Sequence, residues 1–148
     1  MKIYFTEKNV SSDLEAIEVA GSVLVQEGRV MPEFITACTD REKIYPTGLG
    51  LPSGQAVAMP HGESSFVKED SISIVRTQTP VVFKRMEEPD QTVKCQLIFN
   101  LALATGGKHI TVLRKLMGLF QDEMFIQNCM QYDNISLIKY VCEQLEEG

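Results

Sequence analysis

Apolar residues in the first third of the chain recur at helical spacing. Ser12, followed three residues later by Glu15, fits a capping box, and the helix that it opens ends before Gly28. Pro32 suits the first turn of a second helix, which Pro46 must terminate. The first of these helices carries one apolar stripe, formed by Leu14, Ile17, Ala20 and Leu24.

The middle of the chain changes to the shorter period of strands. Val93–Leu103 is apolar at every odd position and carries Lys94, Gln96 and Asn100 at even ones, which predicts a strand with one buried face. Residues 45–54, dense in glycine and proline, predict an irregular loop, and residues 84–90 predict an exposed loop without chemistry. Three shorter strands are predicted at Ala56–Met59, Ile72–Arg76 and Val81–Phe83, the last of them following Pro80 at a sheet edge.

Helical spacing returns in the last third. Gly106-Gly107 is predicted to end the long strand, and a long helix through Ile110 and Phe120 follows. A short helix is expected around Met124–Met130, and Asn134 can cap a last one. Because helices flank a central block of strands, we expect one α/β domain over residues 1–148, a layered sandwich with a central mixed sheet.

Composition and charge limit the classes of function. A chain of 148 residues with 44% apolar residues is long enough for one domain with a full core. Its net charge of −6 offers no basic field for a polyanion, so nucleic acid is not expected as a partner. The N-terminus lacks the apolar core of a signal peptide, and no apolar run approaches the roughly 18–20 residues of a membrane span. We therefore expect a cytoplasmic protein.

Several kinds of chemical site are disfavoured by the sequence. The four cysteines are scattered through apolar surroundings without a C-x-x-C pair, so we expect reduced structural thiols. No P-loop and no G-x-S-x-G turn is present. Two histidines without cysteine or carboxylate at ligand spacing make a poor zinc set, and we expect no metal and no cofactor.

Both histidines of the chain lie at predicted junctions between elements. His61 follows a short apolar strand in Met59-Pro60-His61-Gly62, where it is either a turn residue or an exposed nucleophile with a pKa near neutrality. Gly62, lacking a side chain, would let a phosphoryl group approach. His109 lies in a predicted first helical turn, either as a surface residue beside Lys108 or as part of an anion site at the helix N-terminus.

Several motifs, taken in order, resemble one known family. Arg41-Glu42-Lys43, Pro46-Thr47-Gly48, residues 56–62 and His109-Ile110 follow one another as in the EIIA domains of the bacterial sugar phosphotransferase system, of the fructose/mannitol type. The resemblance covers nearly the whole chain. It implies that His61 accepts a phosphoryl group from phosphorylated HPr and passes it to a cysteine of the EIIB component. His109 is its implied companion, and Arg41 is the implied charge that steadies the phosphoryl group.

The physics of phosphoryl transfer fits these implied roles. The transition state is loose and in line, so the protein must supply positioned positive charge and hydrogen-bond donors rather than a metal. The Arg41 guanidinium offers a planar fork of donors. The protein would reach the membrane EIIC component only indirectly, and we expect an apolar docking surface of Leu49, Leu51 and Met59 around the imidazole.

Two departures from the mannitol-type pattern bear on the sugar. The interval between Arg41 and His61 is longer, and Glu63 stands where a lysine commonly follows the Pro-His-Gly turn. Together with Tyr45-Pro46-Thr47-Gly48, these features resemble the galactitol-specific branch. Two other functions stay open: a regulatory domain of the nitrogen-related type that signals through its phosphorylation state, and an α/β binding module without phosphoryl chemistry.

Overall fold

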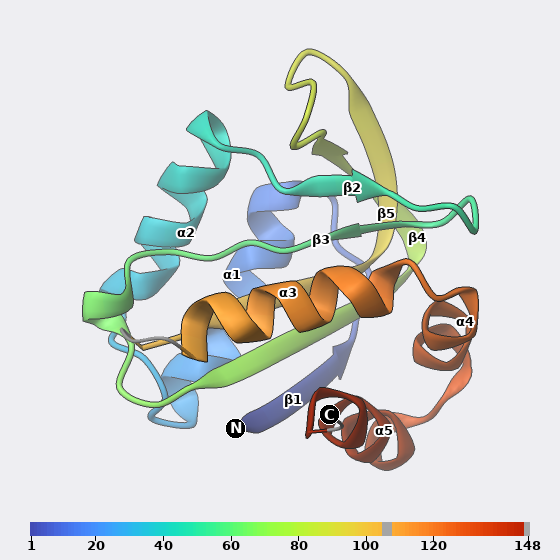
Figure 1. Ribbon diagram of the computed structural model, residues 1–148. Helices are drawn as coiled ribbons and strands as arrows, with labels where there is room; N and C mark the ends of the chain where they lie inside the picture. The colour runs from blue at the N-terminus through green and yellow to red at the C-terminus, as the bar shows by residue number, and fades with distance from the viewer. Residues whose placement is uncertain (105–107, 147–148) are drawn as a thin grey trace.

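The computed structural model describes residues 1–104 and 108–146, with the side chains of Lys108 and His109 outside the description. Five strands in these residues form one mixed sheet in the order β1-β4-β5-β3-β2 (Figure 1). The strands are β1 (Lys2–Glu7), β2 (Gly48–Gly50), β3 (Ala56–Ala58), β4 (Ser71–Lys84) and β5 (Thr92–Ala102). The α-helices are α1 (Asp13–Gln26), α2 (Glu33–Ile44), α3 (Lys108–Phe120), α4 (Glu123–Gln131) and α5 (Asn134–Glu146).

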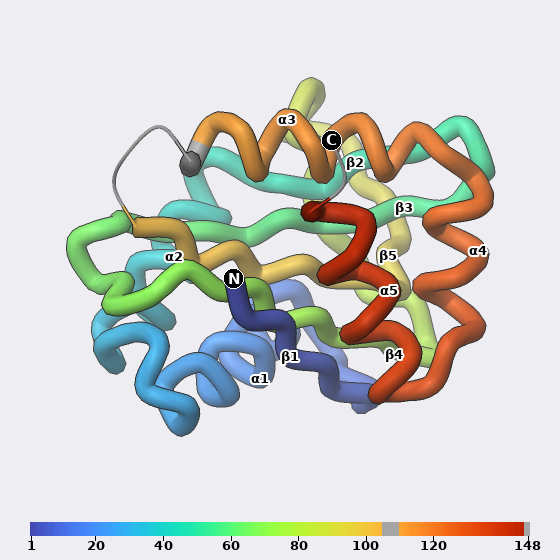
Figure 2. The backbone as a smooth tube through the Cα atoms, turned by 60° about the horizontal axis from the view of Figure 1, so that its bottom comes forward, coloured from blue at the N-terminus to red at the C-terminus, as the bar shows by residue number. Residues whose placement is uncertain are grey.

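Helices cover both faces of the sheet, which confirms the predicted α/β sandwich with a mixed sheet. In Figure 1, α3 lies in front of the sheet, whereas α1 and α2 lie behind it. The larger core cluster joins apolar side chains of the sheet to α3, α4 and α5, and it includes Phe99, Phe120 and Phe125, whose rings contact one another at tilted angles. Two smaller clusters join the other face to α1 and α2. Figure 2 shows α5 beside the edge strand β1.

The cap of α1 agrees with the sequence, whereas the cap of α5 differs by one residue. The Ser12 hydroxyl accepts the Glu15 amide at 3.1 Å and starts α1, as the capping box predicts. Asn134 is the first residue of α5, and the carboxylate of Asp133 accepts the Ser136 amide at 3.1 Å. Asp133 is therefore the capping residue, because its side chain reaches an unpaired amide of the first turn.

The strands differ from prediction in three ways. The pieces expected at Ile72–Arg76 and Val81–Phe83 are one strand, β4, whose register shifts between Arg76 and Val81. β1 was missed, and it pairs in parallel with β4. β2 lies in the stretch expected to be an irregular loop and pairs antiparallel with β3. The expectation that Gly106-Gly107 ends β5 lies outside the described residues.

β5 is buried on more than one face. Asn100 and Ala102, at even positions, are as fully buried as the odd positions beside them, because helical layers cover both sides of this central strand. The alternation predicted for Val93–Leu103 therefore holds only in its first half, where Lys94 is exposed.

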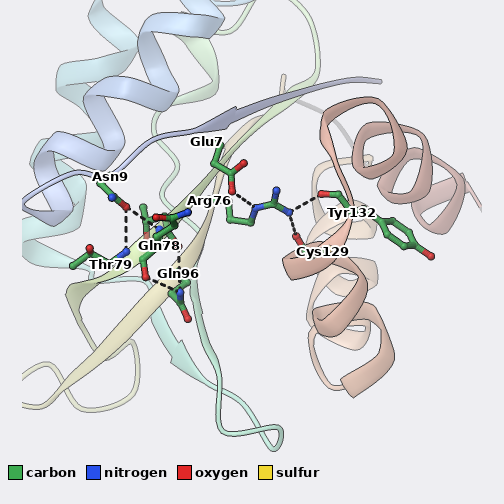
Figure 3. A network of polar contacts seen from close by, with 9 residues as sticks. Glu7, Asn9, Arg76, Gln78, Thr79, Gln96, Cys129 and Tyr132 are labelled. Atoms are coloured by element: carbon green, nitrogen blue, oxygen red, sulfur yellow. Dashed lines mark hydrogen bonds and ion pairs between the residues drawn. The ribbon is translucent and has the colours of Figure 1, made fainter.

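One buried arginine ties the sheet to the C-terminal helices. Arg76 of β4 pairs with Glu7 of β1 at 2.9 Å and donates to the backbone carbonyls of Cys129 and Tyr132 at 3.0 and 2.7 Å (Figure 3). Its guanidinium also lies over the ring of Phe5. The partners at the C-terminal end of α4 are carbonyls that the helix itself leaves unpaired, so Arg76 satisfies them and orients α4.

Two further properties of the described residues bear on the expectations from sequence. All four cysteines are free, and three of them, Cys38, Cys95 and Cys129, are buried. None of the helices within residues 1–104 and 108–146 is long and apolar enough to cross a membrane.

Candidate functional site

His61 lies just beyond the carboxyl end of β3. β3 runs parallel to β5, and His61 continues this pairing through a short bridge to Leu101. The Leu101 amide donates to the carbonyl of Pro60 at 2.9 Å. The sheet therefore fixes the turn at the carboxyl ends of two parallel strands, where open α/β sheets bind their ligands.

The imidazole of His61 is oriented by the backbone. Its Nδ1 lies 2.7 Å from the carbonyl oxygen of Met59. Because a carbonyl can only accept, Nδ1 carries the proton in this contact, and the lone pair of the neutral ring is on Nε2. The ring is half-buried. This tautomer presents Nε2 as the nucleophilic atom.

Arg41, the second candidate residue from the sequence, lines the same hollows as His61. Two adjoining hollows of about 430 and 390 Å³ share the lining residues Arg41, Ile44, Tyr45 and His61. Arg41 is in the last turn of α2, and its guanidinium lies 5.1 Å from the centroid of the Tyr45 ring. This cation–π contact holds the cation at the rim and leaves N–H donors at the edge of the guanidinium plane available for anions.

The rim of this site is apolar and exposed. Ile44 and Tyr45, which follow Arg41 closely in sequence, are 69% and 61% exposed. Exposed apolar side chains grouped around polar ones are typical of a protein interaction surface. The larger hollow is completed by Pro46, Thr47, Met59, Met86, Pro89, Leu113 and Met117.

This lining corrects two expectations. Met59 lines the larger hollow as expected, but Leu49 and Leu51 line neither hollow, and Leu51 is buried in the core. The hairpin loop between β4 and β5, expected to have no chemistry, supplies Met86 and Pro89 to the wall. Proximity along the chain was a poor guide here, because the wall comes from a hairpin distant in sequence.

The hairpin loop is held against β2. The Met86 amide donates to the carbonyl of Gly48 at 2.8 Å. A Cβ atom on Gly48 would lie 2.6 Å from the carbonyl oxygen of Lys84, so the hairpin packs where only glycine leaves room. Gly48 thus allows the wall of the site to close on β2.

Beneath the site lies a buried carboxylate that sequence reasoning gave no role. Glu42 of α2 is 4% exposed and accepts the amide and the hydroxyl of Thr47 at 2.8 and 2.9 Å. Desolvation raises its pKa to about 7, while the Thr47 hydrogen bonds act in the opposite direction. The only signal in the sequence is its place between Arg41 and the Pro46-Thr47-Gly48 motif.

A side chain at position 62 would point toward α2. The nearest atoms to a Cβ built on Gly62 belong to Ala37 and Cys38. The absent side chain leaves room for the neighbouring helix, and Gly62 also lines the smaller hollow with His61 and Arg41. That Gly62 lets a phosphoryl group approach stays a prediction.

His109 remains a candidate from sequence. Its backbone lies in the first turn of α3, as predicted, and its side chain lies outside the described residues. Within the described part of the chain, no group of three or more histidine, cysteine or acidic side chains is placed to hold a metal ion.

The sequence matches one protein family along almost its whole length. Residues 2–145 match the family model of the "Phosphoenolpyruvate-dependent sugar phosphotransferase system, EIIA 2". The chain is 33% identical over 126 residues to the mannitol-specific EIICBA component of Escherichia coli K12, covering 83% of the chain and only 18% of that longer protein. It is 30% identical over 144 residues to the mannitol-specific enzyme IIA component of Staphylococcus aureus Mu50, covering 96% of the chain and 92% of that protein.

Solved structures agree with this match. The complex of enzyme IIA and phosphorylated enzyme IIB for mannitol from Escherichia coli contains a similar chain, with a TM-score of 0.72, 27% identity and coverage of 97% and 93% of the two chains. The nitrogen regulatory protein IIA-Ntr from Neisseria meningitidis has a TM-score of 0.68, 28% identity and coverage of 97% and 92%.

These relatives refine the expectation from sequence. The two relatives described above are named for mannitol, so the galactitol-specific branch finds no support in them. The fructose/mannitol-type family itself is confirmed. With its family model matched from residue 2 to residue 145, the chain belongs to the EIIA 2 family of the phosphoenolpyruvate-dependent sugar phosphotransferase system.

Proposed function

We propose that the protein is a phosphocarrier in which His61 accepts a phosphoryl group from phosphorylated HPr and passes it to a cysteine of a sugar-specific EIIB component. Membership of the EIIA 2 family supports this role. The complex of the similar Escherichia coli mannitol enzyme IIA with phosphorylated enzyme IIB supports the choice of acceptor. We further propose that residues 1–148 act as one carrier domain in the cytoplasm, where both partners would be met.

The observation that carries the proposal is the contact of His61 Nδ1 with the Met59 carbonyl, beside Arg41 in one hollow. This contact favours a neutral ring with its lone pair on Nε2. In the first step, Nε2 bonds to phosphorus as the bond between phosphorus and the donor's histidine nitrogen breaks. In the second step, the thiolate of EIIB bonds to phosphorus and the bond to Nε2 breaks.

Arg41 has an electrostatic role in this proposal. The three equatorial oxygens of the transferring group carry the negative charge, and the loose transition state needs positioned cations more than covalent assistance. Arg41 shares both hollows with His61 and offers several N–H donors in one plane. The apolar rim of Ile44 and Tyr45 would exclude water when a partner docks.

The test is phosphorylation of the purified chain. Incubation with phosphoenolpyruvate, Enzyme I and HPr is expected to add the mass of one phosphate, and the bond is expected to be labile to acid. His61→Ala is expected to remove this uptake completely. Nitrogen-15 NMR of the phosphorylated chain is expected to place phosphorus on Nε2. Acid-labile phosphate on the His61→Ala variant, or none on the wild-type chain, contradicts the proposal.

A second candidate is a regulatory domain that reports its phosphorylation state to another protein. The likeness to the nitrogen regulatory protein of Neisseria meningitidis supports it. The two functions share phosphorylation of His61 and differ in the acceptor. Transfer from the phosphorylated chain to an EIIB cysteine favours transport, and failure with mannitol-type and galactitol-type EIIB proteins alike favours regulation.

For the sugar we propose a mannitol-type system. The support is the printed specificity of the relatives in Escherichia coli and Staphylococcus aureus. Glu63 and the longer interval after Arg41 are the features that favour galactitol instead. Side-by-side transfer to purified mannitol-type and galactitol-type EIIB proteins decides between them, because faster transfer identifies the partner for which the docking surface is built.

A further inference from the structure

Glu42 is a buried acid that forms no ion pair with another described residue. Arg41 and Lys43, its neighbours on α2, are exposed, and none of the ion pairs between described residues includes Glu42. A carboxylate in the last turn of a helix also faces the negative end of the helix dipole. An apolar side chain of similar size would be expected to give a more stable protein at this position. The presence of a glutamate at this buried position therefore needs an explanation other than stability.

The two oxygens of Glu42 are both used on one residue. Thr47 donates its amide to Oε2 at 2.8 Å and its hydroxyl to Oε1 at 2.9 Å. Thr47 is 2% exposed, so neither donor exchanges with bulk water. A hydroxyl has one proton to give, and Glu42 takes it. The Thr47 oxygen is then left to act as an acceptor.

The Thr47 hydroxyl oxygen accepts a hydrogen bond from the segment that leads from β3 to His61. Thr47 precedes β2 and Met59 follows β3, one position beyond the antiparallel pair Gly48 and Ala58. At that position the Thr47 hydroxyl accepts the Met59 amide at 3.2 Å, in the manner of one more rung of the ladder. The Met59 carbonyl in turn accepts Nδ1 of His61.

We propose that Glu42 is a positioning residue for His61, acting through the Thr47 hydroxyl and the backbone of Met59 to fix the ring with its proton on Nδ1. This inference rests on the proposed function of His61 as the phosphoryl acceptor. While Glu42 is ionised, each bond in the series has a fixed direction, because a carboxylate and a carbonyl accept and an amide donates. The Met59 carbonyl selects the tautomer because it can only accept, and the bonds from Glu42 through Thr47 hold the backbone of Met59 in place for this contact.

The test compares Glu42→Gln and Thr47→Val with one conservative variant, Thr47→Ser. In Glu42→Gln an amide N–H₂ group faces one of the Thr47 donors, so the directions of the bonds must change. Thr47→Val keeps the shape and loses the hydroxyl. Phosphoryl acceptance from HPr is expected to slow by about 10- to 100-fold in both, the loss typical of a misplaced reacting group. Thr47→Ser, which keeps the hydroxyl, is expected to stay within about threefold of wild type.

A second readout separates positioning from mere folding. Nitrogen-15 NMR of His61 in the unphosphorylated chain reports which ring nitrogen carries the proton. The share of the Nδ1-protonated form is expected to fall in Glu42→Gln and Thr47→Val, and to stay unchanged in Thr47→Ser and in the control Glu18→Gln on the exposed face of α1. A purely structural role would lower the melting temperature and leave this share unchanged in the folded protein.

The outcomes are distinct for the two proposals. If the wild-type chain takes no phosphate from HPr, the proposed function fails, and the tautomer measurement still decides the role of Glu42. If both Glu42→Gln and Thr47→Val fold with the wild-type tautomer and accept phosphate at the wild-type rate, the positioning role is overturned. If either variant is too unstable to study, Glu42→Asp, which withdraws the carboxylate from Thr47 by one methylene, takes its place with the same readouts, and Thr47→Ser remains the control.

Discussion

Gly62 packs so closely against Cys38 that a Cβ atom on Gly62 would lie 3.1 Å from the Cys38 amide nitrogen and 3.2 Å from its Sγ. The turn that holds His61 and the helix that holds Arg41 are therefore in direct contact. Because one of the close atoms is backbone, α2 would have to shift as a whole to make room. The close approach of the His61 turn to α2 thus depends on a residue without a Cβ atom at position 62.

Gly62→Ala is expected to push the turn and α2 apart by a few tenths of an ångström. We expect about 1–3 kcal/mol of lost stability from overpacking and slower phosphorylation of His61, measured by urea unfolding and by the phosphotransfer assay. The matched control is Gly118→Ala in α3, where a Cβ meets no atom within 4 Å. That variant is expected to be unchanged or about 1 kcal/mol more stable, since alanine favours a helix. Equal effects of the two substitutions would contradict the packing argument.

Arg41→Ala is expected to slow phosphoryl acceptance by about 100-fold, because one positioned donor to the transferring group is lost. Stability should change by no more than about 1 kcal/mol, the value of an exposed cation over a ring. Arg41→Lys keeps the charge without the planar fork and should fall in between. Lys43→Ala serves as the control, since Lys43 is an exposed cation two residues further along α2 and lines neither hollow. An Arg41→Ala protein with wild-type transfer rates would rule out the role.

The free energy of unfolding is expected to depend on pH through the titration of Glu42. Desolvation, with a smaller contribution from Asp13, raises its pKa from 4.5 to about 7, against the Thr47 hydrogen bonds and Arg41. The folded chain therefore binds this proton more tightly than the unfolded chain. The cost of ionising Glu42 is absent below about pH 4.5, grows as the pH rises to about 7, and is on the order of 3 kcal/mol above that.

Urea unfolding of the wild type and of Glu42→Gln between pH 5 and pH 8 checks this sign. The wild type should lose stability relative to the variant as the pH rises through this window, because glutamine does not titrate. Two curves that run parallel across the window would show that Glu42 has an ordinary pKa in the folded chain.

Arg76→Met is expected to lower the free energy of unfolding by about 3 kcal/mol. The variant keeps the apolar stem but leaves the carbonyls of Cys129 and Tyr132 and the carboxylate of Glu7 without their donor. Lys139→Met, which removes an exposed pair with Glu143 at 4.0 Å, is expected to cost no more than about 0.5 kcal/mol. Arg76 lines none of the hollows at His61, so the folded fraction should accept phosphate normally.

His109→Ala is expected to fold and to accept phosphate more slowly than the wild type, or to hold it for a shorter time. The reason is its place in the first turn of α3, where a side-chain donor and the helix N-terminus both favour an anion. Single-turnover transfer rates and the lifetime of the phosphohistidine measure the two effects. A variant that matches the wild type in both would remove His109 from the proposed site.

Those parts of the fold that rest on local pattern could be predicted from the sequence. The Ser12 capping box and the stripe from Leu14 to Leu24 specify α1 without help from the rest of the chain. β2 could not be predicted, because its three residues have no strand pattern and are ordered by pairing with β3. Pro80 was read as the start of a separate edge strand, whereas it lies within the register shift of β4.

The candidate residues of the site came from the sequence, whereas their arrangement depends on the fold. Order along the chain pointed to Arg41 and His61, and the structure brings them to one hollow. The burial of Glu42 was not predictable, since it lies between two charged residues and only tertiary packing turns it inward. The wall formed by Met86 and Pro89 depends on how a distant hairpin folds back on β2, which no local spacing records.

The hairpin loop that supplies Met86 and Pro89 forms a wall of the site whose sequence can change independently of the sheet. It is anchored by the Met86 amide on Gly48, and residues 87–90 beyond this anchor are exposed. Insertions or exchanges there would reshape one side of the docking surface while leaving every strand pairing that holds His61 in place. Partner choice can thus diverge between related carriers, or be redesigned by loop grafting, without any change to the chemistry of transfer.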